Sequence, residues 1–462
     1  MSAPLLTLGF LLIATFAFGG SARGDELGVI LLRPISVIAL LISLYWIKPE
    51  HIRNHRFWTF WLLSIVALTL LHLIPLPPSI WHMLPGRDLA IEADRLIGTP
   101  DAWRPISLSP ELTRNALWSM VAPLACFLLM IQLSRRDMTR ALIIIVVLGA
   151  VSGMLSVIQI SQGPGSIAYL YRITNFGLGV GLFANRNHQA VLLVCLIPIS
   201  LGLAMIAVKA NEALTRGVAP AMVQWGLALA AVFIFILVMV TGSRTGLALY
   251  VLAMAATLIF ARRKAAFLFK RADAPKRRAK AGRQMPDLRY ALLILPMLVV
   301  GTVFLSGRDD AFKRLTDTDS DSEARFSIVE TLWGAINAYF PVGSGIGSFD
   351  PVFRAHEGSE ILAPTYWNHA HNDWAELVMT GGLPALLIVA AALFWLVRFY
   401  LVDRSAKTQH TDMEAFRFMG GCVLVLTSLS SIVEYPLRVP ILSCLFVMSI
   451  ALLSKARLSA SR

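Results

Sequence analysis

The sequence is poor in charged residues, and this shortage excludes a soluble globular protein. Charged side chains make up 15% of the 462 residues, whereas hydrophobic side chains make up 56%. A soluble chain normally carries about 25% charged residues. The apolar residues here fall in repeated runs of about twenty, the length at which a helix crosses the hydrocarbon core of a bilayer. The composition therefore predicts an all-α polytopic membrane protein.

Cysteine is also rare, and its placement argues against disulfide bridges. The four cysteines, Cys126, Cys195, Cys422 and Cys444, all lie within apolar runs. We expect them to pack as small hydrophobic residues. A basic segment, which begins a secretory signal peptide, is missing before the first apolar run, and a second run follows closely. We interpret the first run as a retained helix.

Apolar runs divide the chain into twelve predicted spans. They lie near residues 4–20, 27–47, 57–74, 115–133, 141–161, 188–208, 220–240, 245–261, 290–306, 375–397, 417–433 and 439–454. An even number of spans places both termini on one side of the membrane.

The distribution of charged residues then predicts on which side of the membrane the termini lie. The loops and tail at 48–56, 134–140, 209–216, 262–289, 398–417 and 455–462 hold 26 lysines and arginines against 8 acidic residues. The opposite side carries the other 20 acidic residues. Because loops rich in lysine and arginine stay in the cytoplasm, both termini are predicted to be cytoplasmic.

This topology predicts three parts. Residues 1–306 hold nine spans, a periplasmic loop at 75–114 and a basic cytoplasmic loop at 262–289. Residues 307–372 form a large periplasmic loop before the tenth span, and residues 373–462 hold the last three spans and a cytoplasmic tail. Loop 75–114 is expected to be irregular, with short amphipathic helices. The basic loop fits the topology and contact with anionic membrane lipids, so a nucleic-acid partner is not expected.

Polar residues gather just before the tenth span. His369, His371, Asn372, Asp373 and Glu376 fall within eight positions. The Asp-x-x-Glu spacing is that of a capping box and predicts that a helix starts at Asp373. His371 then precedes the helix N-terminus, where free N–H groups favour an anion such as a phosphate.

Three roles are open for the two histidines. We favour a catalytic or phosphate-binding role for His371, because so many polar groups converge beside a helix start. His369 and His371 could instead bind a metal with Asp373 or Glu376. Their i,i+2 spacing suits an extended segment, however, and the sequence has no further Cys/His cluster. The third interpretation is packing of both histidines at the membrane interface.

Two arginines lie at outer ends of apolar runs, Arg186 in the segment FANRNHQ and Arg244 in TGSRTG. An arginine within a membrane costs at least about 2.5–3.5 kcal/mol, so it usually has a partner or a function. Snorkelling to the headgroups is the simpler alternative. With Arg325 and His371 on the same side, these arginines could form a cationic pocket for a diphosphate.

Three alternate glycines, Gly343, Gly345 and Gly347, invite comparison with a nucleotide-binding loop. The sequence shows no strand before them and no Lys-Ser/Thr after them, so the spacing alone is a weak signal. A tight turn over a ligand or the membrane surface is the better interpretation.

Taken together, these segments resemble the O-antigen ligase and polysaccharide polymerase superfamily of bacterial inner membranes. The resemblance covers about residues 170–440 and rests on the order and spacing of several motifs. These are FANRNH at 183–188, TGSRTG at 241–246, residues 325–333, FPVGSGIGSF at 340–349, HAHNDWAEL at 369–377 and GGLP at 381–384. The segments PLPP at 75–78 and SLSP at 107–110 resemble members that act on exopolysaccharide or O-antigen.

The resemblance implies a metal-independent, inverting glycosyltransferase of GT-C-like fold that needs no cofactor. It would move a glycan from undecaprenyl diphosphate to a glycan or lipid acceptor at the periplasmic face of the inner membrane. The two key arginines and one histidine of the family correspond to Arg244, Arg325 and His371. Arg186, His369 and Asn372 are further substrate-binding candidates. Members commonly have a glycine where this chain has Ala385, which affects local helix packing more than chemistry.

The residues suit this chemistry. Negative charge grows on a diphosphate leaving group in the transition state, and arginines can stabilise it without a metal. A histidine can accept the proton of the acceptor hydroxyl. Ligase, polymerase and protein O-oligosaccharyltransferase share the donor and stay open as alternatives. A polysaccharide or lipid transporter would need polar residues at mid-span and inverted repeats, which the sequence does not clearly show.

Overall fold

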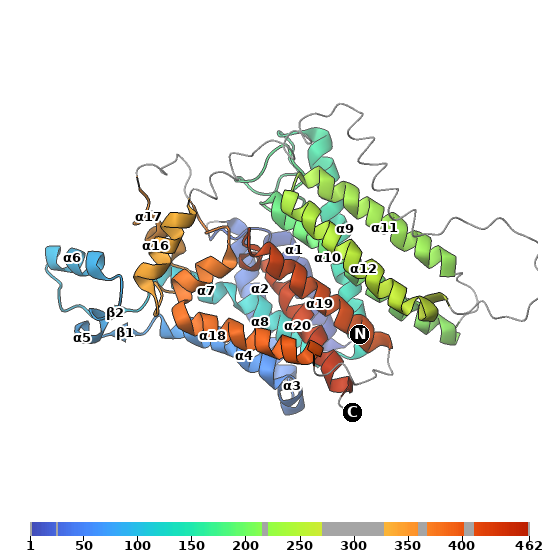
Figure 1. Ribbon diagram of the computed structural model, residues 1–462, viewed down its shortest axis with the longest axis horizontal. Helices are drawn as coiled ribbons and strands as arrows, with labels where there is room; N and C mark the ends of the chain where they lie inside the picture. Colours follow the sequence, from blue (N-terminus) through green and yellow to red (C-terminus); the bar gives the residue numbers. More distant parts are fainter. Residues whose placement is uncertain are drawn as a thin grey trace, which may run out of the picture.

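The computed structural model describes residues 2–24, 26–214, 220–269, 328–358, 367–401 and 411–460, and nearly all of their regular structure is helical (Figure 1). The long and apolar helices are α1 (Ala3–Phe18), α2 (Leu27–Trp46), α4 (Arg56–Leu71), α7 (Pro110–Ser119), α8 (Val121–Gln132), α9 (Arg135–Gln162), α10 (Arg186–Leu214), α11 (Pro220–Thr241), α12 (Arg244–Phe269), α18 (Asp373–Leu401), α19 (Thr411–Ser430) and α20 (Pro440–Ala460). The short helices are α3 (Pro49–Asn54), α5 (Pro78–Trp81), α6 (Asp88–Leu96), α16 (Val329–Tyr339), α17 (Phe349–Arg354) and the 3-10 helix η2 (Pro436–Arg438).

Eight helical segments are long and apolar enough to cross a membrane. They are Leu27–Trp46, Pro110–Gln132, Arg135–Gln162, Arg186–Val208, Arg244–Arg263, Asp373–Tyr400, Asp412–Ser430 and Pro440–Arg457. Three shorter apolar helices, Ala3–Phe18, Arg56–Leu71 and Trp225–Thr241, match further predicted runs. The polytopic all-α class is thus confirmed. The predicted run at 290–306 and most of the basic loop 262–289 lie outside the described residues, so the count of twelve stays a prediction.

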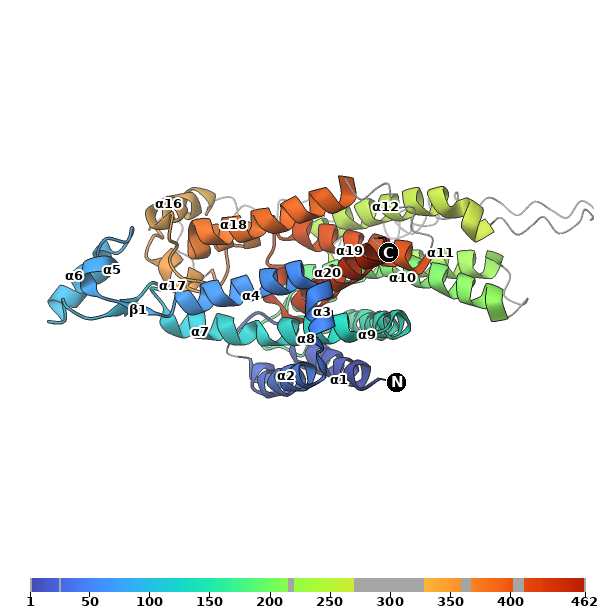
Figure 2. The same ribbon diagram turned by 90° about the horizontal axis from the view of Figure 1, so that it is seen from below.

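The helices differ in how deeply they lie in the bundle. In α10 and α20, 67% and 72% of the most apolar stretch is buried, against 22% in α2 and 28% in α12. Helices α10, α19 and α20 therefore form the centre, and α2 and α12 present apolar side chains outward, as lipid-facing helices do. Figure 2 shows α1 and α2 at one edge beside α8, on the side away from α18. The four cysteines are all free thiols, as expected.

The predicted periplasmic loop at 75–114 is an irregular, packed segment with short helices, as predicted. Strand β1 (Pro75–Leu76) pairs antiparallel with β2 (Arg104–Pro105). Helices α5 and α6 lie between these strands in the sequence. The side chain of Arg87 is buried and donates hydrogen bonds to the carbonyl oxygens of Ile106 and Gly343. This arginine therefore fastens the loop to the glycine turn of a distant segment.

The three alternate glycines form a tight turn that packs against the protein itself. Gly343, Gly345 and Gly347 have φ values of 87°, 109° and 88°, in the region that favours glycine. A Cβ on Gly343 would lie 2.5 Å from the carbonyl oxygen of Thr380, and one on Gly345 would lie 2.5 Å from Ser107. The glycines thus permit close contact with α18 and with loop 75–114.

His72 holds the same turn from the end of α4. Its Nδ1 accepts a hydrogen bond of 3.0 Å from the Ile346 N–H. Burial, aided by the nearby Arg87, lowers the pKa of His72 to about 4, so the ring is neutral at pH 7 and can accept this bond. An unfolded histidine protonates near pH 6.5, so this contribution to stability is lost as the pH falls from about 6.5 towards 4.

Helix α18 is kinked where the glycine turn docks. Gly382 has φ 59° and ψ −151°, a conformation that interrupts the helix two residues before Pro384. The Leu383 N–H then donates to the carbonyl oxygen of Pro341, at 2.8 Å, instead of continuing the helical ladder. The kink depends on the absence of a side chain, because a Cβ on Gly382 would overlap that same carbonyl oxygen.

Replacing Gly382 with alanine should lower the thermal stability of the purified protein. The backbone conformation alone costs a residue other than glycine about 1–3 kcal/mol, and the clash with Pro341 adds to this. Gly334→Ala in α16 is the matched control, because its added methyl meets nothing within 4 Å. That variant should be unchanged or more stable, by up to about 1 kcal/mol. Equal melting temperatures for both variants would contradict this account of the kink.

Candidate functional site

The polar cluster at the start of α18 is assembled from three parts of the chain. Residues 367–372 lead into α18, residues 431–438 connect α19 to α20, and α10 begins nearby at Arg186. The Asp373 N–H donates to the Ser431 carbonyl oxygen at 2.9 Å, which brings the first two segments together. Residues far apart in sequence thus meet at one end of the bundle (Figure 1).

The helix begins at Asp373, as predicted, but the capping residue is Asn372. The Asn372 Oδ1 accepts a hydrogen bond of 3.0 Å from the Ala375 N–H, three residues on, which is the bond of an N-cap. The predicted capping box is therefore wrong, because the residue three positions after the cap is Ala375, whose side chain cannot bond back to the cap. Because Asn372 performs the capping, the carboxylates of Asp373 and Glu376 are available for other contacts.

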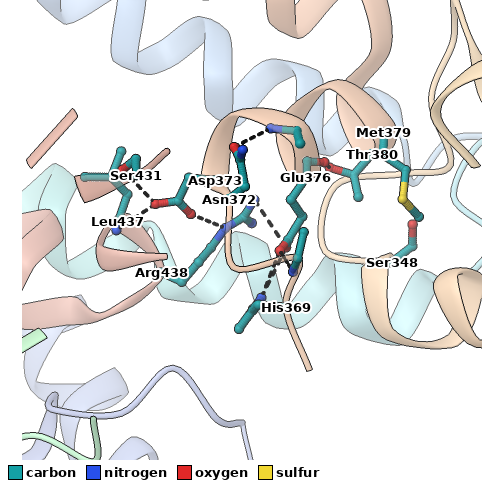
Figure 3. A network of polar contacts seen from close by, with 12 residues as sticks. Ser348, His369, Asn372, Asp373, Glu376, Met379, Thr380, Ser431, Leu437 and Arg438 are labelled. Carbon is teal, nitrogen blue, oxygen red and sulfur yellow. Dashed lines mark hydrogen bonds and ion pairs between the residues drawn. The ribbon is translucent and has the colours of Figure 1, made fainter. Parts of the chain in front are cut away.

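Both carboxylates bind Arg438, which Figure 3 shows reaching between them. The Arg438 Nε lies 3.2 Å from Asp373 Oδ1, and its Nη2 lies 3.3 Å from Glu376 Oε1. Ser431 Oγ and the Leu437 N–H also donate to Asp373 Oδ2. Burial alone would lower the pKa of Arg438, but the carboxylates of Glu376 and Asp373 raise it above its usual value. The guanidinium stays charged and joins α18 to η2.

Glu376 also fixes the segment that precedes α18. His369 Nδ1 lies 3.2 Å from each oxygen of the Glu376 carboxylate, and the Ala370 N–H donates to Glu376 Oε2 at 3.0 Å. Glu376 is only 1% exposed. One buried carboxylate thus holds a histidine ring, a backbone N–H and, through Arg438, the next loop. A substrate-binding role for His369 stays a prediction.

His371 points to a different carboxylate. Its Nδ1 lies 3.4 Å from Glu434 Oε2, and its ring meets Trp367 and Tyr435 edge-on. His371 has φ 48° and is the single non-glycine residue with a positive φ in the part of the chain that the structure describes. Backbone strain of this kind costs about 1–3 kcal/mol and is concentrated at functional sites. The strain therefore marks His371 as a functional candidate.

Glu434 connects His371 to the start of α10. Its side chain is fully buried, and Asn187 Nδ2 donates to Glu434 Oε1 at 2.5 Å. His188 Nε2 lies 3.9 Å from Glu434 Oε2. The ring of Tyr435 contacts His188, His369 and His371, with ring centroids 4.8, 4.6 and 4.9 Å apart. One aromatic ring thus separates three histidines and fixes their relative positions.

The predicted arginines Arg186 and Arg244 are the first residues of α10 and α12. Arg186 is the first residue of α10 and directly precedes Asn187, which binds Glu434. Its Nη1 lies 3.6 Å from the place that a Cβ on Gly242 would occupy, two residues before Arg244 opens α12. Arg325 lies outside the described residues. The structure therefore brings Arg186 and the α11–α12 turn together, next to the residue that binds Glu434.

The two histidines do not share a ligand position. His369 contacts Glu376, whereas His371 contacts Glu434. In the part of the chain that the structure describes, no three His, Cys, Asp or Glu side chains converge as metal ligands. Glu376 lies within hydrogen-bond distance of His369 and can orient its ring, whereas His371 Nδ1 lies 3.4 Å from Glu434 and makes no hydrogen bond to it.

Sequence reasoning missed Glu434, Tyr435 and Arg438 as members of the site. They lie in a short connection between the last two spans, where charged residues at span ends are common. Their partners in α18 are about sixty residues away, and no local spacing reveals them. The available signal was weak: two charged residues, Glu434 and Arg438, flank the segment Tyr-Pro-Leu between two strongly apolar runs.

The fold and this cluster define a polytopic membrane protein with a buried polar site at one end of its helices. Comparison with protein families narrows the class of protein further. The family described as O-antigen ligase matches residues 229–390, a range that includes Arg244, Arg325, His369, His371 and Asn372. This part of the chain thus matches the O-antigen ligase family, which confirms the resemblance seen in the motifs. None of the curated proteins matches the chain in sequence.

Removing the guanidinium between Asp373 and Glu376 should strongly destabilise the protein. In Arg438→Gln two buried carboxylates lose their countercharge, which typically costs about 3–5 kcal/mol. Arg354→Gln is the control, because Arg354 is paired with Asp350 at the surface, where a pair contributes at most about 1 kcal/mol. Thermal unfolding of both purified variants gives the comparison. Equal melting temperatures would show that Arg438 does not hold α18 to η2.

Proposed function

We propose that this chain is a membrane glycosyltransferase that moves a glycan from undecaprenyl diphosphate to an acceptor. The O-antigen ligase match at residues 229–390 supports transfer of a lipid-linked glycan. The all-α bundle with a polar site at one end agrees with a GT-C-like architecture. In this proposal the enzyme inverts the configuration of the transferred sugar and uses arginines rather than a metal.

The observation that carries the proposal is the contact between His371 Nδ1 and the buried carboxylate of Glu434, at 3.4 Å. The two atoms make no hydrogen bond as they stand, and we propose that the carboxylate accepts one from Nδ1–H when substrate is bound, which leaves the Nε2 lone pair available. The same logic of base and orienting acid operates in catalytic triads. His371 is the base, and Glu434 is a positioning residue that acts through it.

The reaction then follows in one displacement. The acceptor hydroxyl oxygen forms a bond to the anomeric carbon as the bond from that carbon to the diphosphate oxygen breaks. His371 Nε2 takes the hydroxyl proton, and undecaprenyl diphosphate leaves with the bonding electron pair. Negative charge grows on the diphosphate during this step, and preorganised arginines stabilise it. We assign this role to Arg186 and Arg244, the first residues of α10 and α12, and to Arg325 by its motif.

We place the site at the periplasmic face of a bacterial inner membrane, with both termini in the cytoplasm. The charge difference between the two sets of loops supports this orientation. In agreement with it, the two marked chain ends lie together, away from α5, α6, α16 and α17 (Figure 1). Undecaprenyl-linked glycans are presented at the periplasmic face in this family, so donor and site would meet there.

Loss of the base should slow turnover without loss of the donor. His371→Ala is expected to lower the rate by about 10²–10⁴-fold, the usual contribution of a positioned base. Binding of a labelled undecaprenyl-diphosphate glycan should change little, and added imidazole should restore part of the rate. The turnover rate of Glu434→Gln should lie between the rates of His371→Ala and of the unsubstituted enzyme. His82→Ala, an exposed histidine of loop 75–114, is the control and should be fully active.

Two results would contradict the assignment. A His371→Ala variant with near-normal turnover would show that the histidine is not the base. A variant that no longer binds the donor would show that His371 is mainly a phosphate ligand.

A further inference from the structure

The first turn of α10 binds the buried carboxylate that faces His371. Asn187 Nδ2 donates a hydrogen bond of 2.5 Å to Glu434 Oε1, and the two residues are only 8% and 0% exposed. The other carboxylate oxygen, Oε2, lies 3.4 Å from His371 Nδ1. We propose that Asn187 is a positioning residue for the glycan transfer and acts on His371 through Glu434. This inference rests on the proposed function.

A glutamate carboxylate needs an anchor before it can orient a histidine. The last torsion of a glutamate side chain is broad, so the plane of an unanchored carboxylate is poorly defined. The hydrogen bond from Asn187 holds Oε1, and because the group is planar, Oε2 then stays beside His371 Nδ1. The carboxylate is therefore in place to accept a hydrogen bond from Nδ1–H when substrate binds.

The backbone of Asn187 is itself held in place. The Asn187 N–H donates to Asn185 Oδ1 at 2.8 Å, and the Arg186 N–H donates to Asn175 Oδ1 at 3.0 Å. These bonds satisfy N–H groups that have no partner within the first turn of a helix. The amide of Asn187 thus extends from a fixed point, which is what a group that orients another side chain requires.

His188 is the competing candidate for this role, and its distance argues against it. His188 Nε2 lies 3.9 Å from Glu434 Oε2, beyond the range of a hydrogen bond. His188 also lies beside the oxygen that faces His371. A donor on that oxygen would compete with His371, whereas a donor on Oε1 leaves Oε2 to His371. The geometry therefore favours Asn187 over His188 as the residue that orients Glu434.

A purely structural role for Asn187 leads to a different expectation. Loss of its amide removes a donor from a buried carboxylate, which lowers stability whether or not that carboxylate serves the base. Such a loss would change turnover by the same factor with or without His371. A positioning role, in contrast, has no effect on turnover once the base is absent. Combining substitutions at Asn187 and His371 therefore separates the two roles.

Turnover of the purified full-length protein in lipid nanodiscs tests the inference, with saturating undecaprenyl-diphosphate glycan and a glycolipid acceptor. Asn187→Ala should lower turnover by about 10–100-fold, because a misplacement of about 1 Å can cost about 10²-fold. Binding of the labelled donor should be unchanged. In the His371→Ala background, the same substitution should lower the residual rate by less than about twofold. Asn337→Ala, at an exposed position of α16, is the matched control and should change neither rate.

Asn187→Leu repeats the test with an apolar side chain of similar size, and melting temperatures show which variants fold. An equal factor in both backgrounds, unchanged turnover in Asn187→Ala, or loss of donor binding would overturn the inference and leave His371 as the base. Failure of both variants to fold would show a structural role for Asn187 and would overturn the inference as well. Near-normal turnover in His371→Ala would contradict the proposed function itself, and this inference with it.

Discussion

The site depends on one buried ion triad, the Arg438 guanidinium between the carboxylates of Asp373 and Glu376. Charges removed from water are costly unless they are paired, so the three groups must stay together. Asp373 and Glu376 lie in the first turn of α18, and Arg438 lies in the connection between α19 and α20. The requirement for pairing therefore fixes one membrane helix against the next loop, at the point where the rest of the site is built.

Both histidines take their positions from this junction. Glu376 holds His369, and Glu434, four residues before Arg438, lies 3.4 Å from His371 and binds Asn187 of α10. The short segment between the histidines consequently presents one ring to each side. In the proposed mechanism His371 serves as the base, and arginines neutralise the donor diphosphate.

The sequence alone predicted the features that depend on neighbouring residues in the chain. Helices were predictable from apolar length because a spanning segment must satisfy its backbone hydrogen bonds internally. The start of α18 at Asp373 was predictable from its polar flank, although Asn372, not Asp373, proved to be the cap. Glu434 and Arg438 were not predictable, because their roles come from contacts with residues about sixty positions away. The turn at Gly343, Gly345 and Gly347 was predicted. The kink at Gly382, against which it packs, was not predicted, because it depends on tertiary packing.

The central claim is that this polar cluster performs an inverting glycan transfer without a covalent intermediate. The most direct test is the stereochemistry of the product formed by the purified protein from an undecaprenyl-diphosphate glycan and a glycolipid acceptor. Nuclear magnetic resonance of the new glycosidic bond gives its anomeric configuration. The account predicts a configuration opposite to that of the donor. Retention of the donor configuration would require two successive displacements at the anomeric carbon and would contradict the single-step role assigned to His371.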